Sequence, residues 1–234
     1  MRVAVVTPYY KETVNQLERC MNSVQAQTYG ATHIMVADGY PRPFEPAAFF
    51  QHITLPYSHK DAGATPRAIG ALSAFSQGFD AVAFVDADNW YAPHHIDTMI
   101  NVAKVSNADA VVATRTIHAL DGTLMYVDRV ESNGENMVDT NSWFILRKAM
   151  HLMPAWIVDP GQRLWSDRHF TKAMFASGIG IVRSDEPTVA YATKWAWHYK
   201  HANLPIPDDA VWIDTDESGN LIHRRHGDQQ NKGI

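Results

Sequence analysis

The stretch Ala81–Asn89 reads AVAFVDADN, a run of five apolar residues that leads directly into two aspartates. A continuous apolar run is typical of a strand buried on both faces of a parallel sheet. Such a strand would carry Asp86 and Asp88 at its carboxyl end, where paired carboxylates suit a hard divalent cation with open positions for phosphate oxygens. An acidic turn that binds nothing is the alternative for these two residues taken alone.

Strand-like and helix-like segments alternate on both sides of this stretch. Apolar runs predict four further strands in the first half of the chain, at Arg2–Val6, His33–Ala37, His52–Leu55 and Asp109–Thr116. Helical spacing and capping signals predict helices after the Thr13–Gln16 capping box, from Thr65-Pro66 to Gly78, and after Pro93. The alternation predicts an α/β, Rossmann-like three-layer sandwich, with a mainly parallel central sheet between two layers of helices.

Polar segments follow three of the predicted strands directly. These segments are Thr7–Tyr10, Asp38–Tyr40 and Asp86–Asn89. Ligands of open α/β sheets bind beyond the carboxyl ends of the strands. We therefore expect the three segments to converge on one crevice that holds the chemistry.

The spacing of strands and helices changes after residue 116. His118–Asn136 is polar with turn signals and predicts a hairpin, while Asp139–Arg147 predicts a strand that runs into a short helix. Further along, the pattern predicts a helix from Ser166 to Gly178, a strand at Val189–Thr193 and a hairpin around Asp216–Asn220.

The length and composition fit one large domain. The chain has 234 residues, 46% of them hydrophobic and 19% charged, which excludes a disordered tail and a disulfide-stapled miniprotein. A single domain of this size buries a substantial core. We expect one domain over residues 1–234, in which a first half (1–116) precedes a second half (117–203) and a tail (204–234).

Charge and cysteine usage narrow the function further. The net charge of −5 disfavours bulk electrostatic capture of nucleic acid, although a local basic groove stays open. Cys20 is the only cysteine, so no internal disulfide forms, which favours a reducing compartment. Val3–Val6 is shorter than the ~7–15 apolar residues of a signal peptide, and no run approaches the ~18 of a membrane span. We expect a cytoplasmic protein without a membrane span.

Four segments of the first half form a recognisable set: VAVVTPYYKE (Val3–Glu12), VADG (Val36–Gly39), DAGATPRAIGA (Asp61–Ala71) and FVDADN (Phe84–Asn89). In order and spacing over residues 3–105 they resemble those of family 2-type glycosyltransferases with the GT-A fold. Two departures stand out. The acidic pair usual at the second strand is here Ala37-Asp38, and the Ala-Arg-Asn core is here Pro66-Arg67-Ala68.

The resemblance implies that residues 1–116 are a nucleotide-sugar-binding half and residues 117–203 an acceptor half. The donor site would take a nucleotide sugar, with a UDP-sugar favoured. It would be lined by Thr7, Pro8, Tyr9, Glu12, Asp38, Arg67, Asp86 and Ala87. Asp38 would hydrogen-bond the base or ribose, and Arg67 would approach the same part of the donor. A divalent cation, Mn²⁺ or Mg²⁺, would be held by Asp86 and Asp88, with His198 of KWAWHYKH (Lys194–His201) as a late ligand. His201 competes with His198 for that role.

The second half would supply the catalytic base for an inverting transfer. Such a reaction needs one carboxylate to take the proton of the acceptor hydroxyl. Asp167 in WSDRHF (Trp165–Phe170) lies where the family carries this base, and the positive end of a helix dipole would keep it ionised. Asp139, before the predicted strand, is the second candidate.

The sequence thus predicts a metal-dependent inverting glycosyltransferase that acts on a hydroxyl-bearing acceptor of unknown class. Two other interpretations remain. A nucleotidyltransferase of sugar phosphates is disfavoured because TPYYKE contains no glycine-rich loop. A degenerate nucleotide-sugar-binding module is disfavoured because Asp86, Asp88 and Asp167 are all present. The oligomeric state stays open.

Overall fold

The computed structural model describes residues 1–45, 47–134, 137–159, 165–215 and 221–230. The chain divides into two compact units. The first comprises Met1–Arg115 and Asp128–Ala190, and the second comprises Thr116–Val127 and Tyr191–Ile234. The first boundary falls beside residue 116, where the sequence pattern changes. The predicted division of the chain into a single domain with two halves and a tail stays a prediction.

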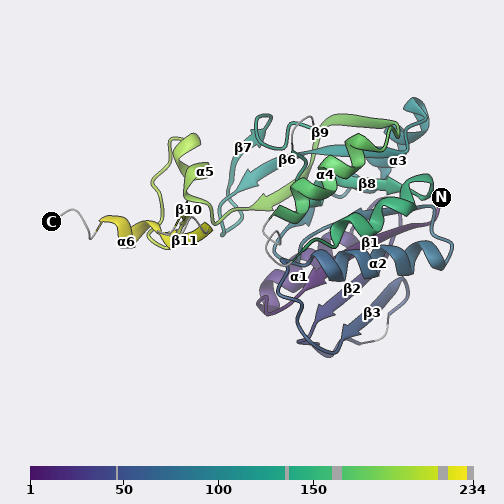
Figure 1. Cartoon of the computed structure of the whole chain (residues 1–234), viewed down its shortest axis with the longest axis horizontal. Helices are drawn as coiled ribbons and strands as arrows, with labels where there is room; N and C mark the ends of the chain where they lie inside the picture. Colours follow the sequence, from purple (N-terminus) through teal and green to yellow (C-terminus); the bar gives the residue numbers. More distant parts are fainter. Residues whose placement is uncertain (46, 135–136, 160–164, 216–220, 231–234) are drawn as a thin grey trace. The chain divides into compact units, whose positions relative to one another are not determined.

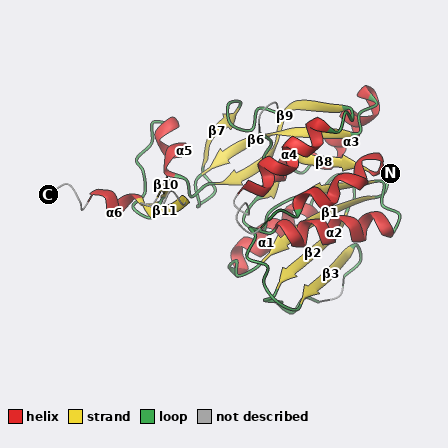
Figure 2. Ribbon diagram, in the orientation of Figure 1, coloured by secondary structure: helices red, strands yellow, loops and turns green. Residues whose placement is uncertain are grey.

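A nine-stranded sheet in the order β3-β2-β1-β4-β8-β6-β9-β5, with β7 paired to β6, forms the centre of the fold (Figures 1 and 2). Pairing is parallel among β1, β2, β3 and β4, and antiparallel where β8 meets β4 and β6 and where β5 meets β9. The strands of this sheet are β1 (Val3–Tyr9), β2 (Thr32–Asp38), β3 (Phe50–Leu55), β4 (Ala81–Phe84), β5 (Trp90–Tyr91), β6 (Ala110–His118), β7 (Leu124–Asp128), β8 (Trp143–Leu146) and β9 (Ile181–Ala192).

Helices cover both faces of the sheet, as the sequence predicts. The helices of the first unit are α1 (Val14–Gln25), α2 (Ala64–Ser76), α3 (His95–Ser106), η1 (Thr140–Ser142), η2 (Arg147–Trp156) and α4 (Ser166–Ala176). α2, η2 and α4 pack on one face, where α2 and α4 lie in front of the sheet in Figure 1. α1 and α3 pack on the other face. The predicted three-layer α/β arrangement is confirmed.

The strands divide their side chains between these two layers. In β1, Ala4 and Val6 contact the α2 side, while Val3 and Val5 contact the α1 side. All four are buried. The close fit extends to Gly70 of α2, where an added Cβ would lie 2.5 Å from Cγ1 of Val6. Burial on both faces explains why β4 and the first four residues of β1, Val3–Val6, form uninterrupted apolar runs.

The N-cap of α1 is the one that the sequence predicts, whereas that of α2 is not. α1 begins with the predicted capping box, in which the side chain of Thr13 accepts from the backbone N–H of Gln16. α2 begins one residue before the predicted cap Thr65, and its N-cap is Gly63. Asp61 instead accepts from the backbone N–H of Thr65 at 2.9 Å. A carboxylate upstream of the helix thus replaces the hydroxyl as the capping group.

The second unit contains short elements of its own: α5 (Ala196–His201), β10 (Val211–Thr215), β11 (Leu221–Arg225) and α6 (His226–Gln230). β10 and β11 pair in antiparallel fashion from Val211↔Arg225 to Thr215↔Leu221, which confirms the predicted hairpin. The turn expected around Asp216–Asn220 lies outside the described residues.

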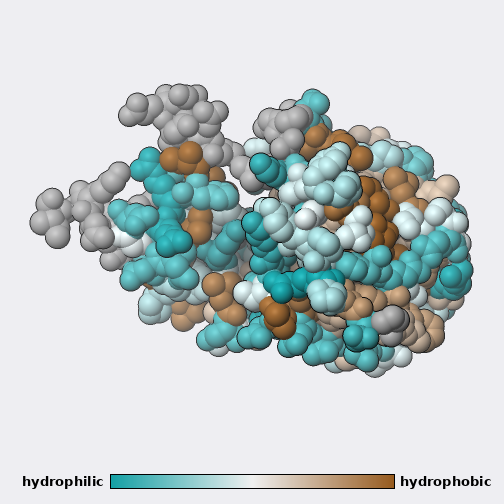
Figure 3. Space-filling view, turned by 90° about the horizontal axis from the view of Figure 1, so that it is seen from below, coloured by the Kyte–Doolittle hydropathy of each residue, from teal (hydrophilic) through white to brown (hydrophobic). Residues whose placement is uncertain are grey.

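The surface carries apolar side chains among polar ones. Figure 3 shows brown, hydrophobic residues interspersed with teal, hydrophilic ones on one face. The most exposed large apolar side chains are those of Val105 (90%) and Phe49 (77%). None of the helices in the described ranges combines the length and hydrophobicity that crossing a bilayer requires.

Candidate active site

The carboxyl ends of β1, β2 and β4 lie side by side, as the parallel register dictates. Tyr9 at the end of β1 pairs with Ala37 of β2, and Val6 pairs with Phe84 at the end of β4. The loop before α2 packs on the same edge, because an added Cβ on Gly63 would lie 3.1 Å from the ring of Pro8. The backbones of the three polar segments, which follow β1, β2 and β4, therefore lie at one edge of the sheet, as the sequence predicts.

Arg67, Asp86 and Asn141 form a junction at this edge. Nη2 of Arg67, in the first turns of α2, lies 2.5 Å from Oδ1 of Asp86, directly beyond β4. Nδ2 of Asn141 donates to Oδ2 of Asp86 at 3.2 Å, and Oδ1 of Asn141 accepts from the backbone N–H of Asp86 at 2.5 Å. Asn141 is fully buried and Arg67 nearly so. The junction fixes the first aspartate of the pair in one orientation.

A buried arginine extends this junction into the second half of the first unit. Oδ1 of Asp139 accepts from Nδ2 of Asn141 at 2.7 Å, while its Oδ2 accepts from Nη1 of Arg115 at 2.6 Å. Arg115 is 1% exposed and also pairs with Asp128, at 2.8 Å, and with Glu131. Buried charges need partners, and the three carboxylates bound to the Arg115 guanidinium all belong to residues 128–139. Arg115 therefore fixes the position of this part of the chain.

Asp139 is therefore bound on both oxygens. Burial raises its pKa, the Arg115 charge opposes that rise, and the charge of Asp86 adds to it. A general base must reach the acceptor proton with a free oxygen. In this structure Asp139 holds Asn141 and Arg115, and its role as the base stays a prediction.

Asp167 lies in the first turn of α4 and is partly exposed. Burial raises the pKa of its carboxyl, a backbone N–H from Arg168 at 2.7 Å lowers it, and the charge of Asp139 raises it further. The net direction is upward. The sequence predicts that the helix dipole keeps this carboxylate ionised, and in the structure the loss of water around it raises its pKa in spite of the helix end. A raised pKa suits a group that must accept a proton near neutral pH.

Two residues predicted to line the donor site have buried side chains instead. Oγ1 of Thr7 is fully buried and lies 2.8 Å from Nε2 of His33. Tyr9 is 2% exposed, with its hydroxyl 2.8 Å from Nε2 of His52. Thr7 and Tyr9 lie two residues apart and therefore share one face of β1, and α1 covers that face with Cys20 and Leu17. Neither offers its side chain to a ligand in this structure.

The other predicted donor residues occupy the strand ends with different contacts. Ala87 is buried against Tyr9 and Leu17, so only its backbone lies in the Asp-x-Asp turn. Oε2 of Glu12 accepts from the backbone N–H of Tyr10 at 2.6 Å.

Pro8 and Asp38 contact the loops that follow β3. The ring of Pro8 lies against Gly63, where an added Cβ would be 3.1 Å away. Asp38 is buried, and its Oδ1 lies 2.7 Å from Nδ1 of His59.

The Asp-x-Asp turn suits a cation that arrives with a phosphate ligand. The backbone N–H of Asn89 closes the turn onto the carbonyl of Asp86, and Nη2 of Arg19 donates to the carbonyl of Asp88 at 2.7 Å. Among the described residues, no group of three or more His, Cys, Asp or Glu side chains is placed to hold a metal ion. Two carboxylates fit Mg²⁺ or Mn²⁺ where diphosphate oxygens complete the coordination.

His198 belongs to the second unit. It is 1% exposed, with Nδ1 2.5 Å from Oγ1 of Thr193, and its ring lies 3.8 Å from that of Trp197. His201 of the same helix contacts the ring of Tyr126, at 4.9 Å between centroids. The role of either histidine as a metal ligand stays a prediction.

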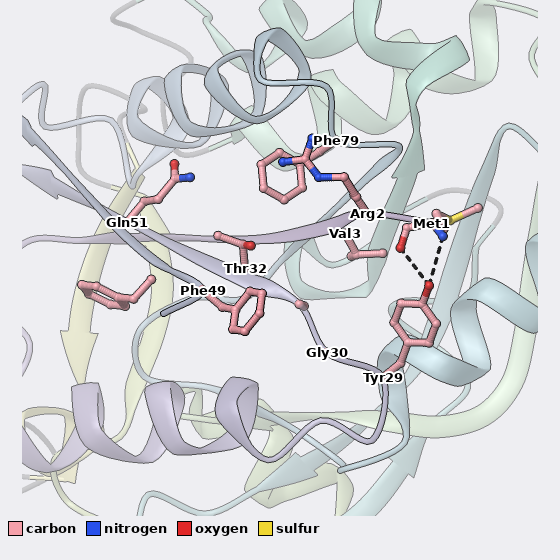
Figure 4. Close-up of a pocket in the computed structure, with 11 residues that line it drawn as sticks. Met1, Arg2, Val3, Tyr29, Gly30, Thr32, Phe49, Gln51 and Phe79 are labelled. Carbon is pink, nitrogen blue, oxygen red and sulfur yellow. Dashed lines mark hydrogen bonds between the residues drawn. The ribbon is translucent and has the colours of Figure 1, made fainter. Parts of the chain in front are cut away.

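A pocket of about 520 Å³ opens at the opposite end of the sheet (Figure 4). It is lined by the amino-terminal ends of β1, β2 and β3, including Arg2, Thr32 and Gln51, and by Phe49 and Phe79. None of its lining residues is a carboxylate or a histidine. Because ligands of parallel sheets bind at the carboxyl ends of the strands, we place the chemistry at the Asp86 edge rather than in this pocket.

Sequence reasoning missed Arg115, His59 and the bridging role of Asn141. The position of Arg115 could have been used for a prediction. It lies near the end of an apolar strand, and a buried arginine needs carboxylate partners. No local sequence pattern predicts the hydrogen bond between Asn141 and Asp86, which are 55 residues apart in the chain. His59 falls in a loop without helical or strand periodicity.

Comparisons with known proteins find one family model and several solved structures that this chain resembles. Residues 4–157 match the family model for glycosyl transferase family 2. Solved structures of S. aureus TarS residues 1–349, alone and with UDP, each match with a TM-score of 0.60, 13% identity and 86% of this chain covered. The complex of the same TarS fragment with UDP-GlcNAc matches with a TM-score of 0.63 over 82% of this chain.

These matches confirm the predicted GT-A fold. This chain spans 63% of the TarS chain in the first two structures and 59% in the third. A comparison with curated proteins finds no match.

Proposed function

The chain belongs to glycosyl transferase family 2, and from this premise we propose that it transfers a sugar from a nucleotide-diphosphate donor to an acceptor hydroxyl. A UDP-sugar is the donor we favour, because the structures of TarS with UDP and with UDP-GlcNAc share this fold. The observation that carries the proposal is the Arg67–Asp86–Asn141 junction, which holds one aspartate of the pair at the ligand-binding edge of the sheet.

Asp167 is the group we propose for proton transfer. The acceptor oxygen attacks the anomeric carbon on the face opposite the diphosphate, and Asp167 takes the hydroxyl proton as that bond forms. The bond from the anomeric carbon to the diphosphate oxygen breaks, and its electron pair leaves with the nucleoside diphosphate. A single displacement of this kind inverts the anomeric configuration.

Asp88, with Asp86 beside it, is where we propose that a divalent cation binds. When bound, Mn²⁺ or Mg²⁺ would neutralise the negative charge on the leaving diphosphate. Asp88 is the main ligand that we assign to the metal, because it is the second aspartate of the turn beyond β4, and Asp86, whose Oδ1 is bound to Arg67, assists it.

The test is release of UDP from a panel of UDP-sugars, with Mn²⁺, with Mg²⁺ and with a chelator. We expect turnover of at least one donor, and Asp88→Ala to lower it by at least ~10²-fold. Asp97→Ala is the matched control, because Asp97 is an exposed aspartate in the first turn of α3. Donor binding without turnover would favour the binding-module interpretation, and no binding of any nucleotide sugar would contradict the proposal.

A further inference from the structure

The carboxylate that the family resemblance assigns to the base or ribose of the donor already has hydrogen-bond partners within this chain. Oδ2 of Asp38 accepts from the hydroxyl of Ser58 at 3.0 Å, and the backbone N–H of His59 lies 3.1 Å from both oxygens. Nδ1 of His59 lies 2.7 Å from Oδ1. With its side chain 7% exposed, Asp38 has little capacity left for a ligand.

The contact with Asp38 selects one tautomer of the His59 ring. A carboxylate oxygen accepts hydrogen bonds, so the contact favours the tautomer in which Nδ1 of His59 carries the proton. In that tautomer Nε2 is an acceptor. Among the residues that the structure describes, none hydrogen-bonds this atom. The side chain of His59 is 23% exposed, so a ligand has access to the ring.

The loop that carries His59 is built to keep one conformation. An added Cβ on Gly39, which has φ +82°, would lie 2.4 Å from the backbone nitrogen of Ser58, so the loop lies directly on the end of β2. Lys60 and Ala62 adopt left-handed φ values of 53° and 55°. Such conformations are costly for residues with a Cβ and concentrate at functional sites. The ring is therefore held in place before any ligand binds.

We propose that His59 reads the nucleobase of the donor through Nε2, with Asp38 as the positioning residue behind it. The inference rests on the proposed function and names the residue that selects the base. Nε2 as an acceptor pairs with an N–H on the edge of the base, such as N3–H of uracil. Tyr57, 66% exposed and 5.0 Å from the His59 ring between centroids, adds an aromatic surface beside it.

The chain's departure from the family pattern agrees with this arrangement. The usual acidic pair is reduced to Asp38 here, and the carboxylate of Asp38 is bound to Nδ1 of His59. A site built to hydrogen-bond one group on a ligand discriminates strongly against analogues without it, because its buried polar atoms are left unpaired. Base selection should therefore depend on the His59 side chain.

Calorimetry with the full chain tests the proposal, using UDP, ADP and N3-methyl-UDP in the presence of Mn²⁺. We expect the wild type to bind UDP at least ~10-fold more tightly than N3-methyl-UDP, because the methyl group removes the N–H donor. His59→Ala should bind the two ligands within about 3-fold of each other, since the acceptor is gone. Its preference for UDP over ADP should fall in the same proportion.

Ser58→Ala is the matched control, because it removes a neighbouring contact to the same carboxylate and leaves Nε2 in place. It should keep the wild-type ratio of UDP to N3-methyl-UDP affinity. If Asp38 reads the base directly, His59→Ala frees that carboxylate and UDP discrimination survives, which overturns the inference. Weakening of all ligands by one common factor also overturns it, because a purely structural role would do that. Wild-type protein that binds no nucleotide would contradict the proposed function instead.

Discussion

Asp167 holds its proton more tightly than an ordinary aspartate, because burial at the start of α4 removes water from its carboxylate. The negative charge of Asp139 acts in the same direction, and the positive charge of Arg67 acts against it. The proposed base is thus tuned by the network that fixes Asp86. Only the ionised form accepts a proton, so turnover should fall as pH drops through this raised pKa.

Asp167→Asn tests the base directly. The amide keeps the shape of the side chain but cannot accept the proton, so kcat should fall by at least ~10²-fold. The donor Kd should stay within about 2-fold, because the substitution acts on the acceptor side. Kinetics with saturating donor, together with calorimetry, measure both. Near-normal turnover would remove Asp167 from this role.

The pH profile supplies a second readout on the same residue. Asp139→Asn removes a charge that raises the pKa of Asp167, so the acidic limb of the kcat profile should move to lower pH. An unmoved limb would mean that another group titrates.

At the scale of elements, β6 organises the segment that leads to β8. Its Arg115 binds Asp128 at the end of β7 and Asp139 just before η1, so one side chain fixes both ends of the connecting segment. η1 then places Asn141 against the turn that follows β4. Residues before and after position 116 of the first unit therefore share one buried hydrogen-bond network.

Asn141→Ala should disturb the donor site without touching the proposed base. It leaves the backbone N–H and one oxygen of Asp86 without a partner, which typically costs about 1–3 kcal/mol. We expect the donor KM to rise on the order of 10-fold, while kcat falls less. Ser142→Ala is the matched control, since Oγ of this buried neighbour has no hydrogen-bond partner among the described residues. Equal effects of the two substitutions would refute the bridging role.

Helices and strands that have a clear local sequence pattern lie close to their predicted positions. The apolar run of β4 and the capping box of α1 lie where the residues predict them. β1 runs past the predicted end at Val6 to Tyr9, because β2 continues to pair with it beyond the last residue paired with β4. The contacts of the site were less predictable, since they join positions tens of residues apart. Asp38 illustrates this, because its partner His59 lies in a loop without periodicity.

At the scale of the whole molecule, the donor residues we propose all belong to the first unit, whereas His198 belongs to the second. The family match ends at residue 157, so most of the second unit lies outside it. A protein of two compact units need not unfold in one step. Thermal unfolding with and without ligands can therefore report on each unit separately.

UDP with Mn²⁺ should stabilise the transition that reports on the first unit. Ligand at 100 times Kd contributes about 2.7 kcal/mol, which corresponds to a rise in Tm of roughly 5–10 °C for a chain of this size. Asp88→Ala should lose the Mn²⁺-dependent part of the rise, because a hard cation loses its main carboxylate. A full rise in that variant would contradict the metal proposal.

The same measurement decides between the two histidines. If His198 ligates the metal, His198→Ala should raise the Mn²⁺ concentration needed for half of the UDP-dependent rise, whereas His201→Ala should leave it unchanged. His198 is buried, so its loss can lower Tm by itself. The comparison is therefore made within each variant, with and without Mn²⁺. An unchanged Mn²⁺ requirement in His198→Ala would exclude His198 as a ligand, and a raised requirement in His201→Ala would assign the role to His201.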